Sequence, residues 1–404
     1  MNNPTTAIGY ESPNRKAWRR FLRNRAAIWG LLVILAACLI ALFGHFIAPD
    51  HSPDADERLY EIGKAAPGYQ IKVLQIKKSH ETLAVPCGIW QQFVVGCADA
   101  DKLLPINDYS LLGNTLVVEK YMGQGRMAQT DSLSAVSVVW GAVDSCVWVS
   151  KDGVGFNTSA GDWQWVSNKE LQQNIAARIS QKRYWLGTDK EGRDNLSRLM
   201  LGTRISLSVG FMAVLISLLL GVFLGAVAGY FRGTVDNIIS AIINLFWSIP
   251  LLLLVFALMM VLERAFWQVY LAIGLTMWVG TARLVRGQVL SLREHDFVSA
   301  ASGLGASHSR IIVRHILPNL LGPVLVLAAA DFANAIIIEA GLTFLGIGVQ
   351  PPAPSWGAML HEYYSYIGTN KAFLALIPGS AICLLVLAFN MVGNGLRDAL
   401  DVRG

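Results

Sequence analysis

The sequence predicts an all-α polytopic membrane protein with six transmembrane helices and an inserted, mainly β or α+β domain between the first two helices. Three observations lead to this fold class. Of the 404 residues, 53% are hydrophobic and only 15% are charged, against about 25% charged residues in soluble domains. Six apolar segments are long enough to cross a membrane as helices. One long polar region, residues 49–183, separates the first segment from the others.

The first apolar segment, residues 26–48, follows a basic N-terminal stretch at residues 1–25. Its length suits a hydrocarbon core of about 30 Å, and the Lys and Arg before it predict a cytoplasmic N-terminus. A cleaved signal peptide also begins with basic residues, but its apolar region has only about 7–15 residues and ends at a small-residue cleavage site. We therefore expect an uncleaved membrane anchor.

The other five apolar segments lie in the second half of the chain, which we assign to one transmembrane domain at residues 184–404. Their alternation returns the C-terminus to the cytoplasm, and the Lys and Arg of the inner loops agree with this topology. Ser248-Ile249-Pro250 should kink the third span, because proline removes a helical hydrogen bond. The expected spans are 205–230, 238–262, 266–290, 319–345 and 373–391.

Residues 49–183 are polar enough to form a folded domain, which the topology places in the periplasm. Val138-Val139-Trp140 and Val147-Trp148-Val149 are short β-rich runs, and Trp163 and Trp165 alternate in another predicted strand.

A helix is predicted after these strands. Ser167 and Glu170 have the spacing of a capping box, and Leu171, Ile175 and Ile179 are spaced for one helical face. This helix is expected to lead back to the membrane.

Five cysteines are present, and none belongs to a CxxC or Cys/His cluster with metal-ligand spacing. Cys87 and Cys97 are close enough in sequence to form a disulfide in an oxidising compartment. Two reduced, buried thiols are the alternative at the same spacing.

The segment between the fourth and fifth spans, residues 291–318, has the pattern of a helix-turn-helix where a short loop is usual. Gly305 breaks the first helix, Ser307 is a suitable N-cap for the second, and Pro318 ends that helix or opens the next span. Topology makes this segment cytoplasmic.

Ala300, Ala301 and Leu304 are expected to form a small apolar face on the first of these helices. A short helix with such a surface suits docking into a groove of a partner. The alternative is an ordinary amphipathic loop that lies on the membrane.

Several function classes are disfavoured by the sequence. The GxxxxGK[ST] phosphate loop does not occur, so any ATPase that drives this protein is another chain. Residues 187–194 look superficially like a phosphate or calcium loop but lack the required spacing, and we expect them to be structural. The net charge of +5 is spread along the chain and predicts no nucleic-acid partner. No catalytic triad or metal site is expected.

Two sets of residues within the spans are candidates for packing and transport. Gly221, Gly225 and Gly229 recur every four residues, which allows close helix contact; the alternative is that each glycine is simply tolerated. Polar groups in the fifth span should face the protein interior or a watery cavity and are candidates for the translocation pathway. Hydrogen bonding to neighbouring helices is their alternative role. The polar residues of the fifth span are Asp331, Asn334 and Glu339, which are predicted to share one arc of the helix.

Ser299-Ala300-Ala301, Gly305 and Leu317-Pro318 resemble the coupling loop of ATP-binding-cassette (ABC) importer permeases, whose pattern is Glu-Ala-Ala, three residues, Gly, and then Leu-Pro. Serine replaces the acidic first residue, so we expect docking through shape and small apolar contacts rather than through the ion pair of that acid.

Further motifs in the same order are similar to those of the C-type permeases of dipeptide and oligopeptide importers. The resemblance covers residues 184–404, with weaker likeness in the first span, and the large region 49–183 departs from the family's shorter connection. The matching stretches are Trp185–Asp189, Gly192–Asp194, Gly202–Leu207, Arg314–Asn319, Glu339–Leu342, Pro351–Gly357 and Leu396–Asp401.

The resemblance implies a multi-pass permease of the bacterial inner membrane that forms half of a peptide pathway. Its implied partners are membrane lipid, a second, B-type permease, two cytoplasmic ABC ATPase subunits that bind ATP and Mg, and a periplasmic solute-binding protein. No cofactor is expected on this chain. The residues implied to act in ATPase coupling are Ser299, Ala300, Ala301, Leu304, Gly305, Arg310, His315, Leu317 and Pro318.

Alternatives concern the substrate and the class of protein. Importers with these motifs also carry nickel or glutathione. A stand-alone channel or secondary transporter should show paired inverted repeats or interrupted helices in both halves, and these are not evident. A receptor with a periplasmic sensing domain should carry a cytoplasmic signalling domain, whereas a short tail follows the last span.

Overall fold

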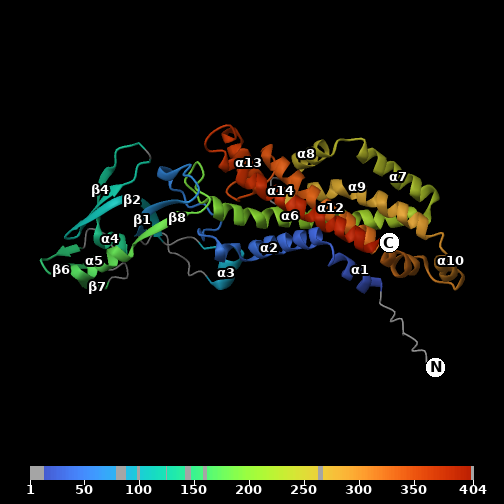
Figure 1. The fold of residues 1–404 in the computed structure, drawn as a ribbon, viewed down its shortest axis with the longest axis horizontal. Coiled ribbons are helices and arrows are strands. Elements are labelled where there is room, and N and C mark those ends of the chain that lie inside the picture. The colour runs from blue at the N-terminus through green and yellow to red at the C-terminus, as the bar shows by residue number, and fades with distance from the viewer. Residues whose placement is uncertain are drawn as a thin grey trace, which may run out of the picture.

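The structure, a computed structural model, describes residues 13–78, 88–97, 101–123, 125–141, 147–157, 162–262 and 267–401. The molecule is elongated, with a bundle of long helices and a β-containing region beyond one end of it (Figure 1). Helices α1 and α10 and the C-terminal end of α14 lie at the opposite end.

Helix α1 (Pro13–Phe21) is short, and α2 (Arg25–Ile47) is the first long apolar helix. The side chain of Asn24 caps α2 by accepting from the backbone N–H of Ala27 at 3.2 Å. One face of α2 packs on α14 and α6, and its leucines on the other face are exposed. This helix matches the predicted anchor at residues 26–48 to within one residue.

The region after α2 contains two antiparallel sheets. The larger sheet has the order β4-β3-β2-β1-β8, and the smaller has the order β5-β6-β7. The strands are β1 (Tyr69–Lys77), β2 (Asp101–Leu112), β3 (Thr115–Lys120), β4 (Gln129–Ser134), β5 (Val147–Val149), β6 (Gly153–Asn157), β7 (Trp163–Ser167) and β8 (Ile179–Tyr184).

This β-containing region has its own hydrophobic core. Its helices are α3 (Ile89–Val94), α4 (Ala135–Trp140) and α5 (Asn168–Ala177), and a 3-10 turn, η1, spans Tyr60–Ile62. The largest buried side chains of the core come from both sheets and from α5: Leu74, Ile106, Leu116, Phe156, Leu171 and Ile175.

Two local predictions for this region were wrong. The run Val138–Trp140 lies in helix α4, because Ser134 caps its start, Gly141 ends it at φ +69°, and its valines pack into the core. The helix begun by Ser167 ends at Ala177, so Ile179 starts strand β8 instead of extending the helix. It is β8 that returns the chain to the bundle.

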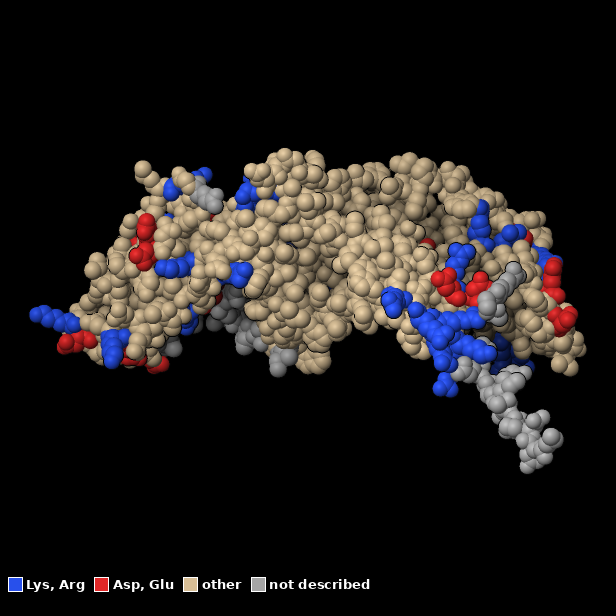
Figure 2. Space-filling view, viewed as in Figure 1, with Lys and Arg blue, Asp and Glu red and all other residues tan. Residues whose placement is uncertain are grey.

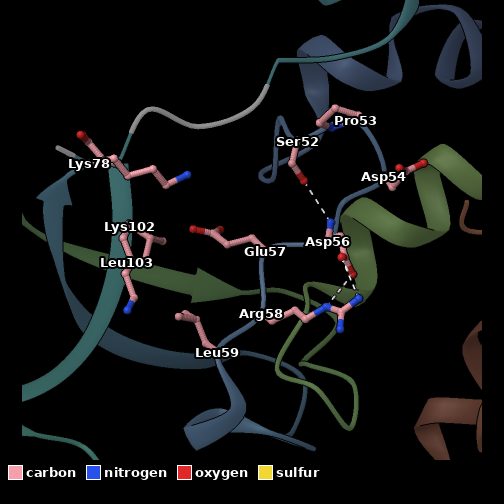
Figure 3. A pocket seen from close by; sticks show the side chains of 11 residues that line it. Ser52, Pro53, Asp54, Asp56, Glu57, Arg58, Leu59, Lys78, Lys102 and Leu103 are labelled. Carbon is pink, nitrogen blue, oxygen red and sulfur yellow. Dashed lines mark hydrogen bonds and ion pairs between the residues drawn. The ribbon is translucent and has the colours of Figure 1, made fainter. Parts of the chain in front are cut away.

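A cleft of about 330 Å³ separates the connector that follows α2 from the sheet (Figure 3). Glu57 and Arg58 lie on the connector side, and Lys78 and Lys102 lie on the sheet side. Glu57 is ion-paired with Lys182 of β8, which ties the connector to the sheet beside this cleft.

Within the described ranges, the chain contains five helices long and apolar enough to cross a membrane, α2 and four in the membrane domain, or up to six if α7 and α8 form one span. The predicted third span is broken: α7 and α8 meet at 93° around Pro250. The kink was therefore predicted, but its size was not. The elements are α6 (Asn195–Phe231), α7 (Gly233–Trp247), α8 (Leu251–Val261), α9 (Trp267–Leu292), α10 (Asp296–Gly303), α11 (His308–Arg310), the π-helical turn η3 (Ile311–Ile316), α12 (Leu317–Phe344), α13 (Trp356–Tyr363), η4 (Tyr364–Tyr366) and α14 (Phe373–Leu400).

Residues 187–194 form a buried structural junction before α6. Asp189 is fully buried and accepts hydrogen bonds from Arg198 at 2.6 Å and from the hydroxyl of Tyr363 at 3.1 Å. Burial acts to raise the pKa of Asp189, but the charges of Arg198 and Arg193 outweigh it, so the pKa lies below its ordinary value. These bonds fix the start of α6 against α13.

Charged side chains are concentrated at the two ends of the molecule (Figure 2). Lys and Arg gather around α1, and the middle of this face is almost free of charge. Such a band suits the hydrocarbon layer of a membrane, with charged groups in water on either side.

Candidate coupling and translocation sites

The segment from α10 to the start of α12 forms a helix-turn-helix. Helix α10 ends at its C-cap Leu304, and Gly305 follows with φ +77°, a conformation that glycine adopts without strain. Ser307 is the N-cap residue of α11, and Pro318 lies in the first turn of α12. Both ends of the turn therefore use the residues that the sequence suggests.

The predicted apolar face of α10 is split between the inside and the outside of the molecule. Ala301 is 9% exposed and packs with Val298 in a cluster that includes Val289 of α9 and Ile311 of η3. Leu304 is 89% exposed, and Ala300 is exposed too. The grouping of Ala301 with the docking face was wrong, because Ala301 attaches α10 to its own chain.

A hollow of about 640 Å³ lies beside the exposed side of α10. Ser299 and Ser302 line it from α10, with Tyr230 of α6 and His308 of α11 opposite. The Tyr230 hydroxyl and Nδ1 of His308 are hydrogen-bonded at 2.9 Å, and the guanidinium of Arg293 lies 5.5 Å from the centre of the Tyr230 ring. Sequence reasoning missed Tyr230, which comes from α6, and did not single out Arg293 and His308 within residues 291–318, because the fold alone brings the three side chains together.

The remaining predicted coupling residues follow α10 along the chain. Arg310 and Pro318 are exposed, and Leu317 is half-buried at the start of α12. The backbone oxygen of His315 accepts a hydrogen bond from Asn319 at 2.7 Å, which ties η3 to α12.

Asp331 and Asn334 line a cavity of about 590 Å³ at the break between α7 and α8. Trp247 and Pro250 form its wall on the side of the broken helix pair. Thr281 of α9 donates a hydrogen bond to Asp331 at 3.4 Å, and Asp331 is the only acidic residue among those that line this cavity. A mostly apolar cavity with one carboxylate and one amide can accommodate a ligand that carries a cationic or polar group.

Glu339 does not line this cavity. It is fully buried and accepts hydrogen bonds from Ser206 of α6 at 3.1 Å and from Thr343 at 3.0 Å. Glu339 is five residues after Asn334, and five residues of an α-helix correspond to a rotation of about 140°, so the two side chains leave the helix in different directions. The prediction that Glu339 shares one arc with both Asp331 and Asn334 was therefore wrong, and its hydrogen bonds give it a helix-packing role.

The three glycines of α6 lie against α9. A Cβ on Gly221 would come within 2.5 Å of Cβ of Thr281, and one on Gly225 within 2.5 Å of the Ala282 oxygen. A Cβ on Gly229 would be 2.8 Å from the Arg286 oxygen. Since side chains do not fit at these distances, the two helix backbones approach as closely as glycine permits.

Cys97 is in a disulfide, and Cys87, the partner considered from the sequence, lies outside the described residues. Within the described ranges, no group of three or more His, Cys, Asp or Glu side chains is arranged to hold a metal ion.

Two regions of the chain match known families. Residues 221–403 match the family described as binding-protein-dependent transport system inner membrane component, and residues 12–67 match the N-terminal TM domain of oligopeptide transport permease C. The two matches flank residues 68–220, which include both sheets.

Individual relatives agree with these families. The dipeptide transport system permease protein of Alkalihalophilus pseudofirmus is 44% identical over 218 residues, which cover 54% of this chain and 71% of the relative. The oligopeptide transport system permease protein of Bacillus subtilis is 40% identical over 220 residues, covering 54% and 72%. The glutathione transport system permease protein of Pectobacterium atrosepticum is 41% identical over 218 residues, covering 54% and 72%. The chain therefore belongs to the binding-protein-dependent inner membrane permeases, among the C-type permeases of dipeptide and oligopeptide ABC importers.

Proposed function

We propose that this chain is the permease subunit of an ATP-driven importer that forms half of the pathway for dipeptides and oligopeptides across the inner membrane. The family membership and the names of its relatives support this substrate class. The observation that carries the transport mechanism is the exposed surface of α10, with Leu304 and Ala300 unburied beside a hollow of about 640 Å³.

Coupling to ATP hydrolysis takes place at this surface. A separate cytoplasmic ATPase subunit receives α10 in a groove, and closure of two such subunits around ATP and Mg moves α10. A second, B-type permease completes the pathway, and a periplasmic solute-binding protein delivers the substrate. The Lys and Arg near α1 support a cytoplasmic position for this end of the bundle.

The β-containing region then lies on the periplasmic side, where it contacts the binding protein. This role can be tested by a deletion between Tyr69 of β1 and Tyr184 of β8. The two residues are paired neighbours in the sheet, so a short linker can join them. Removal of residues 70–183 with a short glycine linker leaves the junction around Asp189 in place. We expect complex assembly to persist and binding-protein-dependent uptake to fall. Unchanged uptake kinetics would contradict this role.

Asp331 is proposed to contact the substrate in the pathway. Asp331→Asn removes the charge and keeps the size of the side chain that lines the cavity beside Asn334. We expect lower peptide uptake by an importer that still assembles. The matched control is Glu339→Gln, a buried carboxylate outside the cavity, which should lower stability instead.

Uptake of labelled dipeptides and longer peptides, in a strain that lacks its own peptide importers, tests the substrate class directly. The complex should accumulate peptides in a manner that depends on ATP and on the binding protein. Glutathione uptake is the second arm, because one relative is a glutathione permease of similar identity. Accumulation of glutathione without other peptides, or of nickel, would overturn the peptide assignment.

A further inference from the structure

A short helix of the β-containing region lies against the membrane helix α2. Helix α3 is at the end of α2 that faces the two sheets (Figure 1). Trp90 is 81% exposed, and Gln91 is exposed as well. Trp90 and Phe93 are three residues apart and share one side of the helix, where their rings meet edge to face at 6.4 Å.

Phe93 connects α3 to the last turns of α2. Its ring centre is 6.1 Å from that of Phe43 and 6.1 Å from that of Phe46. Because α2 ends at Ile47, these contacts place α3 at the outer limit of the apolar helix. The depth of Trp90 in a membrane is thus set by α2.

The C-terminal end of α3 is fixed to the connector after α2. Gly96 has φ +84°, and a Cβ there would come within 2.6 Å of the His45 side chain and 3.0 Å of Cα of Pro53. The backbone N–H of Cys97 donates to the oxygen of His51 at 3.0 Å. The position of α3 relative to α2 is therefore specified by backbone packing as well as by aromatic contacts.

The exposed aromatic side of α3 continues the exposed apolar surface of α2. The large apolar side chains exposed along the last turns of α2 include Leu39, Leu42, Phe43, Phe46 and Ile47. Trp and Phe at the end of a membrane helix suit the boundary between acyl chains and headgroups, where an indole ring buries its apolar body and keeps its N–H in a polar layer.

We propose that α3 is an interfacial element that seats Trp90 in the headgroup region of the outer lipid leaflet and so holds the β-containing region at the membrane surface. The occupant of this surface is phospholipid. The continuity of the patch with the membrane-facing side of α2 favours lipid over a soluble partner, and the polar Gln91 gives the helix the amphipathic character of interfacial segments.

The proposal requires membrane insertion of α2 and is independent of what the importer carries. The first test uses the full importer complex in native membranes, with a photo-crosslinking benzophenone amino acid in place of Trp90. The matched control carries the same amino acid in place of Trp148, which is 69% exposed on β5 of the smaller sheet. Neither position is buried, so neither replacement should disturb folding.

Mass spectrometry of the labelled peptides distinguishes the possible neighbours. A phospholipid adduct at position 90 and none at position 148 is the expected result. An adduct to the second permease or to the binding protein at position 90, the absence of any adduct there, or equal lipid labelling at both positions would overturn the proposal.

Fluorescence provides a second measurement on the reconstituted complex. In phosphatidylcholine vesicles brominated at shallow acyl positions, Trp90→Phe should reduce the fraction of tryptophan emission that bromine quenches. Trp148→Phe should not reduce that fraction, because it removes an emitter that bromine does not reach. A quenchable fraction in Trp90→Phe that is equal to or higher than that of the wild type would place Trp90 outside the lipid and contradict the proposed role of α3.

Discussion

Replacement of Leu304 by alanine tests the coupling surface without disturbing the permease itself. Leu304 is 89% exposed at the end of α10, so its side chain contributes little to the stability of the free chain. Leu304→Ala also leaves the glycine at position 305, so the left-handed conformation that ends α10 is still available. A loss of binding can therefore be assigned to the surface that Leu304 presents.

The size of the effect follows from the apolar area that docking would bury. Leucine carries three more carbon atoms than alanine, and each buried methylene contributes about 0.8 kcal/mol, so the loss is about 2 kcal/mol. Since 1.4 kcal/mol corresponds to a factor of ten, the affinity for the ATPase subunit should fall roughly 30-fold.

The assay is the dissociation constant of the ATPase subunit for the purified permease pair in nanodiscs, followed by peptide uptake in cells. Leu112→Ala is the matched control, because Leu112 is 68% exposed at the β2–β3 hairpin in the larger sheet. The control should bind and transport as the wild type does. An affinity for Leu304→Ala within threefold of the wild type, with normal uptake, would refute docking through this side chain.

Three further predictions concern backbone conformation, helix packing and buried charge. Gly305→Val should strain the turn at φ +77° by about 1–3 kcal/mol and reduce uptake, whereas Gly305→Asn, which tolerates this conformation, should retain more uptake. Gly225→Ala would place a Cβ 2.5 Å from a carbonyl oxygen of α9 and should lower stability by about 1–3 kcal/mol in thermal unfolding. Gly287→Ala should leave the stability unchanged, because a Cβ on Gly287 would meet no atom within 4 Å. Equal melting temperatures for the two variants would contradict the close α6–α9 contact. Asp189→Asn removes the fully buried carboxylate that pairs with Arg193 and Arg198, while Glu362 still pairs with both, so it should cost about 1.5–3 kcal/mol, a loss absent from Asp131→Asn at the surface. Because the folded-state pKa of Asp189 is lowered, its stabilising effect should be complete above about pH 4 and disappear as the pH falls through the lowered pKa; a pH-independent difference between wild type and Asp189→Asn would contradict this.

Hydropathy and charge predicted most of the helical framework. The anchor at α2 and the last two long helices, α12 and α14, begin within about two residues of the predicted positions, because about 20 consecutive apolar residues have few alternatives to a membrane helix. The turn around Gly305 was also predictable, since the φ +77° that it adopts is strained for most other residues.

Tertiary packing decided what the sequence patterns left open. The valines of α4 fit a strand by their β-propensity, yet capping by Ser134 and burial in the core favour a helix there. Helical periodicity placed Ala301 beside Ala300 but gave no information on which side meets the rest of the chain. Glu339 was separated from the cavity by hydrogen bonds to Ser206, a contact between two helices far apart in sequence.

In the proposed coupling mechanism, the burial of Ala301 provides the link between α10 and the membrane helices. Val298 and Ala301 belong to one buried cluster with Val285 of α9 and Leu320 of α12, and α10 contacts η3, which in turn contacts α12. A shift of α10 should therefore be transmitted to these helices. Close-packed interiors transmit such displacements because they have low compressibility. Gly225 then links α9 to α6 at backbone distance, which leaves no flexible side chain to absorb the movement. We therefore expect Ala301→Gly to weaken coupling more than ATPase binding, the reverse of the effect expected for Leu304→Ala.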